Sequence, residues 1–380
     1  MTQRVVFLGA GDGGLMAANR LARMMRQELD RGELEILLIS DSDRHLYQPG
    51  LLYIALDQAQ PDGFFRPQRQ LTLPGVQLIV DPAVRIAPEK RVVECASGRR
   101  VEYDFLVIAT GSHPDLDAIP GLRQGGYSFY TTEEALRLRK ALQGFQGGRV
   151  LMTIGVPHKC PVAPLEFMFI LDDYLRRAGL REKTELVYTY PIARLHTVQP
   201  VADWTARVFA ERNIRGETFF NMESVDPDAH KVSTLEGEEM EYDLLVAIPP
   251  HVGAKVVRDS GLADNEGWLP TDPKTLKMKG QERIYVLGDA TDLPISKAGS
   301  VAHYESEVVA RNLVHELRGE PPTVLYDGKV FCFIEAGLEE ATYVAFDYKT
   351  PPRPTAPAAM IHWFKLAYNE MYWLSLRGLL

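Results

Sequence analysis

The feature that most constrains the fold is a glycine-rich turn, Gly9-Ala10-Gly11-Asp12-Gly13-Gly14, near the start of the chain. An apolar run from Val5 to Leu8 precedes the turn, and a helical pattern from Leu15 to Leu29 follows it. A second apolar run then ends at Ser40 and Asp41. The order strand, glycine turn, helix, strand predicts a βαβ unit that starts a parallel sheet.

The glycines of this turn match the needs of a dinucleotide-binding unit. Gly9 permits the tight turn, Gly11 lets the backbone approach a pyrophosphate, and Gly14 allows close packing of helix on strand. Ala10 and Gly13 complete the turn at the helix amino terminus, which would face the phosphates. Ser40 and Asp41 stand where an adenosine ribose would be held. A glycine turn without a ligand is the alternative, which the complete βαβ context disfavours.

Composition excludes several classes of protein. The 380 residues are 46% hydrophobic and 24% charged, as expected for a globular protein of two or three domains. The net charge of −9 argues against nucleic acid as a partner. A strand begins by residue 4, which leaves no room for a signal peptide, and no apolar run reaches the roughly eighteen residues of a membrane span. The three cysteines lack zinc-ligand spacing, so no metal site is expected.

Two later strands also end in glycine turns. Residues 104–111 read as a strand buried on both faces that ends at Gly111, and residues 283–289 read as a strand that ends at Gly288 and Asp289. An acid at the carboxyl end of a sheet strand points into the ligand crevice. Just before the first of these strands, residues 76–103 alternate apolar and polar side chains, which suggests short antiparallel strands.

A second βαβ pattern begins at residue 149. We expect strands at 149–155 and 185–190, with helices at 164–178 and 202–212. The turn of this unit reads Gly155-Val-Pro-His-Lys-Cys-Pro161, so prolines and a lysine replace the glycines that a close backbone approach requires. The second unit is therefore expected to keep the scaffold without its own dinucleotide. Residues 243–249 echo 104–111 and are expected to return the chain to the first domain.

Taken together, the three glycine-bearing elements resemble those of the two-dinucleotide-domain flavoproteins. The resemblance implies an α/β fold with two Rossmann-like domains, the second inserted in the first. It implies a first domain made of residues 1–115 and 241–318, a second domain at 116–240, and a C-terminal segment at 319–380. It also implies FAD as the cofactor. The implied FAD contacts are Gly9, Ala10, Gly11, Gly13, Gly14, Ser40, Asp41, Gly111, Gly288, Asp289 and Lys297.

Within that group, Cys160-Pro-Val-Ala-Pro-Leu-Glu166 resembles the CPxAPxE motif of sulfide:quinone oxidoreductases. The resemblance covers nearly the whole chain and includes a late cysteine, Cys332, and His196. It implies oxidation of sulfide through a Cys160–Cys332 pair and electron transfer through FAD to a membrane quinone. Lys159, His158 and the start of a helix would lower the pKa of the Cys160 thiol from about 8.5. The alternative for either cysteine is a packed apolar residue, the role we expect for Cys95.

Three other residues carry weaker expectations. Glu166 would carry protons for quinone reduction, or would only serve as an acid in the first turn of a helix. Lys297 would neutralise charge near the flavin, or would be an ordinary surface lysine. We expect His196 to be a packed or solvent-facing histidine. Many relatives have another cysteine where this chain has Tyr130, so FAD is expected to be bound without a covalent link.

The C-terminal segment is aromatic and amphipathic. Apolar side chains recur at helical spacing from Met360 to Leu374, whereas His362 and Lys365 forbid a transmembrane helix. With Trp363 and Trp373, this pattern suits a helix that lies in a membrane interface. Docking on the protein's own core or on a second subunit is the alternative, so a homo-oligomer stays open. The residues expected near quinone are Phe331, Phe333, Phe364 and Tyr368.

The interpretation is a peripheral membrane flavoenzyme whose partners are sulfide, membrane quinone and the bilayer surface. A type II NADH:quinone dehydrogenase is the first alternative, favoured by the stretch from His45 to Pro49 but opposed by the missing second glycine motif. A flavocytochrome-type sulfide dehydrogenase and a flavin-binding sensor without turnover are the others.

Overall fold

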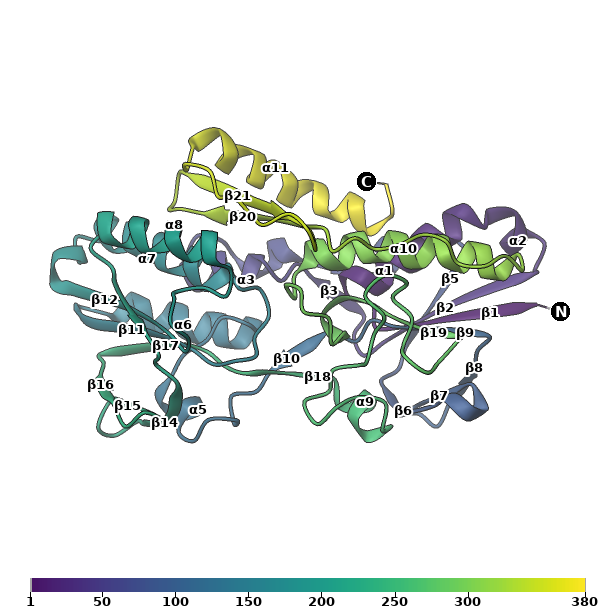
Figure 1. The fold of residues 1–380 in the computed structure, drawn as a ribbon, viewed down its shortest axis with the longest axis horizontal. Coiled ribbons are helices and arrows are strands. Elements are labelled where there is room, and N and C mark those ends of the chain that lie inside the picture. The colour runs from purple at the N-terminus through teal and green to yellow at the C-terminus, as the bar shows by residue number, and fades with distance from the viewer. Residues whose placement is uncertain (1, 380) are drawn as a thin grey trace.

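The structure, a computed structural model, describes residues 2–379 and consists of two parallel sheets in separate lobes (Figure 1). The first sheet has the order β19-β9-β1-β2-β5, and its strand pairs are all parallel. Its strands are β1 (Gln3–Leu8), β2 (Leu34–Ser40), β5 (Val76–Val80), β9 (Phe105–Ile108) and β19 (Ile284–Val286). Every residue of β9, which lies between β19 and β1, is buried, as expected for a strand covered on both faces.

Helices α1 (Asp12–Met24) and α10 (Gly299–Leu317) lie together on one face of the first sheet. The helix expected from residue 15 to 29 begins earlier and ends at Met24. At Met25 the backbone leaves the helical region before the short helix α2 (Arg26–Asp30). Within residues 76–103, β5 joins the parallel sheet. The antiparallel prediction holds only for β6 (Ala83–Ala87), β7 (Val92–Cys95) and β8 (Arg100–Glu102).

The second lobe is built on a parallel sheet of order β13-β12-β11-β17. Its strands are β11 (Gly148–Ile154), β12 (Thr184–Tyr190), β13 (Arg215–Thr218) and β17 (Leu244–Ile248). Its helices include α6 (Thr132–Gly144), α7 (Ala163–Arg177) and α8 (Gln199–Glu211), and α8 begins three residues before the predicted start. A small antiparallel sheet of β14 (Met222–Asp226), β15 (Lys231–Thr234) and β16 (Glu239–Glu241) flanks it.

The prediction that residues 243–249 return the chain to the first sheet was wrong. Strand β17 pairs in parallel with β11, with Val150 opposite Leu244 and Ile154 opposite Ile248. A fully buried apolar strand fits the middle of either sheet, so its sequence does not identify its neighbour. The boundary placed at residue 240 therefore separates β17 from its own sheet. Two short strands join the lobes: β10 (Ser112–Pro114), which follows β9, and β18 (His251–Gly253), which follows β17. They pair antiparallel.

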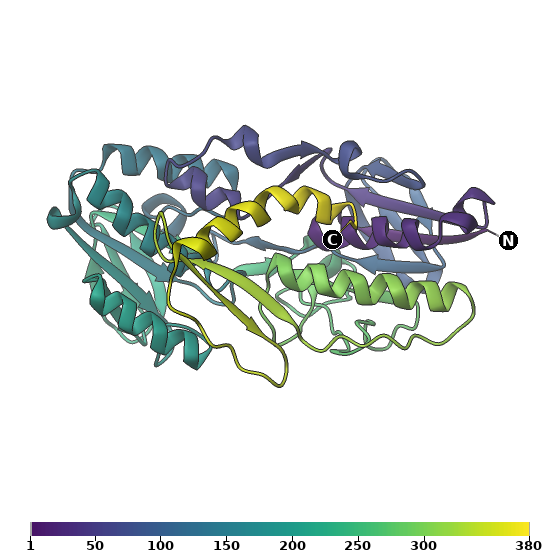
Figure 2. The same ribbon diagram turned by 90° about the horizontal axis from the view of Figure 1, so that it is seen from above.

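The C-terminal segment spans both lobes. Strands β20 (Val330–Glu335) and β21 (Ala341–Phe346) form an antiparallel pair, and helix α11 (Ala359–Leu376) runs above them. Seen from above, α11 crosses the junction and ends beside α1 (Figure 2). There the amide of Asn19 donates to the carbonyl oxygen of Leu376 at 2.8 Å. This segment therefore closes the crevice between the two sheets.

Candidate active site

A cavity of about 340 Å³ lies at the carboxyl ends of the first sheet's strands, and we call it the glycine cavity. Three elements far apart in sequence meet in it: the turn after β1, the end of β9 and the end of β19. Of the residues predicted to contact FAD, it is lined by Gly9, Ala10, Gly11, Gly13, Ser40, Asp41, Gly111, Gly288 and Asp289. The parallel register of the strands brings these turns together.

The glycines have different roles in this cavity. Gly9 has a φ of +105°, and a Cβ there would overlap the carbonyl oxygen of Ala109. A Cβ at Gly14 would overlap the carbonyl oxygen of Gly9, so the absence of a side chain lets α1 pack against β1. A Cβ at Gly11 would meet no atom of the described chain within 4 Å. Gly11 thus leaves open space in the cavity, whereas Gly9 and Gly14 allow the close backbone packing that forms the cavity wall.

The residues present fit a dinucleotide. Gln68 and Thr110 line the cavity, and the buried Oε1 and Oγ1 atoms of these side chains have no hydrogen-bond partner within residues 2–379. A polar ligand would satisfy them. The buried ammonium of Lys159, which also lines the cavity, donates to the carbonyl oxygen of Ser112 at 3.2 Å and would face a phosphate or the flavin ring. Gly11, Ser40 and Asp41 would hold the adenosine half, and Asp289 the ribityl chain.

A hydrogen-bonded triad connects the glycine turn to α11. The Tyr372 hydroxyl donates to Asp12 Oδ1 at 2.5 Å, and His45 Nε2 lies 2.5 Å from the same hydroxyl. The other ring nitrogen of His45 lies 3.1 Å from the carbonyl oxygen of Ala10. Burial alone would raise the pKa of Asp12, but His45 and Tyr372 lower it, so the carboxylate stays ionised. Sequence reasoning did not assign this triad, because its members are far apart in the chain.

A second cavity, of about 130 Å³, lies between the first and α11, and we call it the cysteine cavity. Asp12, Ala298 and Gly299 line both cavities, so the two share a wall. The cysteine cavity contains most of the residues predicted for sulfide and quinone chemistry. These are Cys160, Cys332, Glu166, Phe331, Phe333 and Tyr368. The chain thus brings the loop before α7, strand β20 and helix α11 to one place.

Cys332 faces the amino terminus of a long helix. Its Sγ lies 3.8 Å from the hydroxyl of Ser300, in the first turn of α10. Burial raises the pKa of the Cys332 thiol to about 11, although the Ser300 hydrogen bond acts in the opposite direction. Cys332 is a free thiol, as are Cys95 and Cys160.

The expectation of a lowered pKa at Cys160 was wrong. Burial raises the pKa of this thiol, and the nearby Glu166 and Cys332 add to the effect. The Lys159 ammonium points into the glycine cavity instead, and burial lowers the pKa of His158 to about 4, which leaves that ring neutral. Cys160 also precedes α7 by three residues, with a φ of +52° and its amide donating to the carbonyl oxygen of Lys297 at 2.7 Å.

Glu166 is buried in the first turn of α7 and forms an ion pair with Lys365 of α11. It also accepts a hydrogen bond from the amide of Glu335 at 3.0 Å. Burial raises the pKa of Glu166 despite the neighbouring ammonium. The sequence singled out Lys365 only as a residue that forbids a membrane span, and it missed Glu335.

Four predicted residues lie outside the cavities. The Lys297 ammonium donates to the carbonyl oxygens of Asp289 and Thr291 and packs 3.9 Å from the centre of the Trp268 ring, so it faces neither cavity. Phe364 is 59% exposed on the outer face of α11. His196 is buried, and Gly14 serves packing. Tyr130 does line the glycine cavity, and its hydroxyl donates to the carbonyl oxygen of Lys159 at 3.0 Å.

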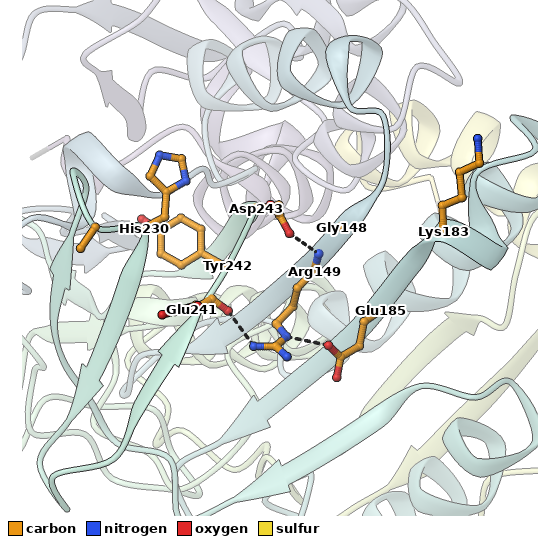
Figure 3. Close-up of a pocket in the computed structure, with 9 residues that line it drawn as sticks. Gly148, Arg149, Lys183, Glu185, His230, Glu241, Tyr242 and Asp243 are labelled. Atoms are coloured by element: carbon orange, nitrogen blue, oxygen red, sulfur yellow. Dashed lines mark hydrogen bonds and ion pairs between the residues drawn. The ribbon is translucent and has the colours of Figure 1, made fainter.

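A larger hollow of about 580 Å³ lies on the second lobe, at the amino ends of its strands. Arg149 crosses it, with hydrogen bonds to Glu185 and to the carbonyl oxygen of Glu241 (Figure 3). Ligands of parallel sheets bind at the carboxyl ends, which is the opposite edge. Arg149 is already paired with Glu185, and we assign no site there.

The chain is similar to several known proteins over most of its length. The family described as pyridine nucleotide-disulphide oxidoreductase matches residues 3–311. The chain is 28% identical to the mouse mitochondrial sulfide:quinone oxidoreductase over 93% of its own length and 80% of that protein. The solved sulfide:quinone oxidoreductase of Aquifex aeolicus superposes with a TM-score of 0.88 at 25% identity, covering 99% of this chain and 92% of that one. An Arabidopsis alternative NAD(P)H-ubiquinone oxidoreductase is 24% identical over 84% of this chain and 68% of that protein.

Proposed function

The chain belongs to the pyridine nucleotide-disulphide oxidoreductase family as an FAD-binding oxidoreductase, and we propose that it oxidises sulfide and reduces a membrane quinone. One observation carries the proposal: Cys160 and Cys332 line the same cavity, which shares a wall with the glycine cavity. The sulfide:quinone oxidoreductases among its relatives support this choice of substrates.

The cysteines would handle sulfur. Hydrosulfide attacks one sulfur of a Cys160–Cys332 disulfide, which leaves a persulfide on that cysteine and a thiolate on the other. Ser300, whose hydroxyl lies 3.8 Å from Cys332 Sγ, would stabilise Cys332 as the leaving thiolate when hydrosulfide attacks Cys160. When bound, FAD would accept the electron pair released from sulfur and pass it to quinone. Loss of that electron pair and release of the added sulfur together allow the Cys160–Cys332 disulfide to re-form, which returns the pair to its starting state.

The quinone end would lie at the same cavity. Phe331 and Phe333, whose ring centres are 4.9 Å apart, and Tyr368 supply an apolar wall, and Glu166 supplies a protonatable group. The outer face of α11 leads from there to lipid: Met360, Trp363 and Phe364 are 65%, 67% and 59% exposed. Among residues 2–379, no helix is both long and apolar enough to cross a bilayer. We therefore propose peripheral attachment through α11, with FAD held without a covalent bond.

A type II NADH:quinone dehydrogenase is the second candidate, favoured by the similarity to the Arabidopsis enzyme. The turn after β11 opposes it. This turn carries Pro157 and Lys159, and a Cβ at Gly155 would already crowd Pro250, so the backbone offers little room for a second pyrophosphate.

The test is to load the protein with FAD and add sulfide or NADH without oxygen while recording the flavin absorbance. Sulfide should bleach the flavin within the time of one turnover, and a short-chain quinone should restore the colour. Rapid bleaching by micromolar NADH, with none by sulfide, would replace the proposal with the dehydrogenase.

A further inference from the structure

A chain of buried titratable side chains extends from the cysteine cavity to the edge of α11. The Lys365 ammonium is paired with Glu166 Oε1 and lies 3.6 Å from Glu335 Oε1. The other oxygen of Glu335 lies 2.9 Å from His362 Nδ1. The Tyr53 hydroxyl also donates to Glu335 Oε1, at 2.9 Å. These contacts form a continuous path from Glu166, which lines the cysteine cavity, to His362, which does not.

Of the four side chains on this path, that of His362 is the most exposed. The side chains of Glu166 and Lys365 are each 9% exposed, that of Glu335 is 1% exposed, and that of His362 is 13% exposed. Four elements supply the groups: α7, β20, α11 and α3 (Gly50–Ala55), which carries Tyr53. His362 lies in the first turn of α11, beside the exposed Trp363. It is thus the end of the path that solvent can reach.

The charges of this cluster require an additional proton. Two carboxylates and one ammonium leave one net negative charge, and an uncompensated charge inside a protein is costly. A single proton on His362 or on either carboxyl neutralises the cluster, and the direct contacts allow that proton to change place. The cluster therefore holds one proton that it can give up and take back.

We propose that His362, Glu335 and Lys365 form a relay that carries protons from solvent to Glu166 and the quinone oxygen. This inference rests on the proposed function. There, hydrosulfide, quinone and one proton give sulfur and quinol: two electrons leave sulfur, hydrosulfide releases its own proton, and solvent supplies the second. His362 takes up that proton, Glu335 and Lys365 pass it on, and Glu166 donates it.

The test separates the two half-reactions in a stopped-flow instrument. FAD-loaded wild type and His362→Gln are reduced with dithionite and mixed with quinone, and flavin reoxidation is followed together with proton uptake by an indicator dye. His362→Gln should reoxidise more slowly by about 100-fold or more, in the range of a lost acid–base group. Added imidazole should restore the rate, which it would not do if His362 only held α11 in place. Reduction by sulfide should be unchanged.

A second variant, Glu335→Gln, gives a readout that needs no turnover. Removing one carboxylate makes the cluster neutral without the additional proton, so the wild-type-minus-variant infrared difference spectrum of the resting holoenzyme should show the band of a protonated carboxyl or of an imidazolium ring. The matched control is His315→Gln on α10, outside both cavities, which should behave as wild type in every assay.

The outcomes separate the two proposals. A wild type that does not react with quinone would overturn the proposed function. If the wild type reacts with quinone and His362→Gln is reoxidised equally fast, the relay alone is overturned. The same holds if His362→Gln is slow and imidazole does not restore its rate.

Discussion

At the scale of single residues, the glycine turn separates two roles that look the same in the sequence. Gly14 allows α1 to pack on β1, whereas Gly11 faces open space in the glycine cavity. Both are glycines of one motif, and only the surrounding atoms distinguish a residue needed for folding from one needed for a ligand.

Gly14→Ala should therefore destabilise the protein with or without FAD, by about 1–3 kcal/mol, because the new methyl group overlaps the carbonyl oxygen of Gly9. Gly11→Ala should leave the FAD-free protein as stable as wild type and weaken FAD binding. Thermal melts with and without added FAD measure both effects. Equal losses for the two variants in the absence of FAD would contradict this assignment.

The cysteines are the second residue-scale case. Cys160→Ser and Cys332→Ser should each bind FAD normally and lose sulfide-dependent flavin reduction by about 100-fold or more, because a hydroxyl cannot accept sulfur. The double variant should be no slower than either single one, since the two sulfurs act as a unit. Cys95→Ser, in β7 and away from both cavities, is the control. Near-normal sulfide turnover in Cys332→Ser would show that the pair is not the route.

At the scale of elements, α11 is amphipathic with its polar face directed inward. Lys365 and Tyr372 are buried and His362 contacts Glu335, whereas Met360, Trp363, Phe364, Met371 and Leu374 are exposed. A helix docked only on its own core would show the reverse. This arrangement favours contact of the apolar face of α11 with lipid over docking of that face on the protein's own core.

Replacing Trp363 and Phe364 together with serine should weaken binding to liposomes about 10-fold or more, because two large apolar side chains no longer enter the interface. FAD content and reduction by sulfide should not change, since neither side chain lines a cavity. The control replaces Phe219 and Leu235, exposed on the second lobe, with serine. Sedimentation with vesicles measures both. If the two double variants bind equally well, α11 is not the membrane contact.

At the scale of the whole molecule, the sequence predicted what local pattern determines and missed what distant contacts determine. The glycine turns, the two βαβ units and the exposed face of α11 follow from short-range periodicity and spacing. The neighbour of β17 does not, because any strand with two buried faces fits either sheet. The pKa of Cys160 was predicted in the wrong direction because the sequence places Lys159 beside it, whereas the fold turns that ammonium into the other cavity.

The bond from Tyr372 to Asp12 makes α11 part of the glycine turn as well as the outer surface. Under the proposed attachment through α11, the bilayer and the dinucleotide would be two ligands that act on one element, and thermodynamic linkage between two ligands is reciprocal. By whatever factor lipid contact tightens FAD binding through this bond, FAD tightens lipid contact by the same factor. Chains that have not yet acquired cofactor would be the ones that leave the membrane most easily.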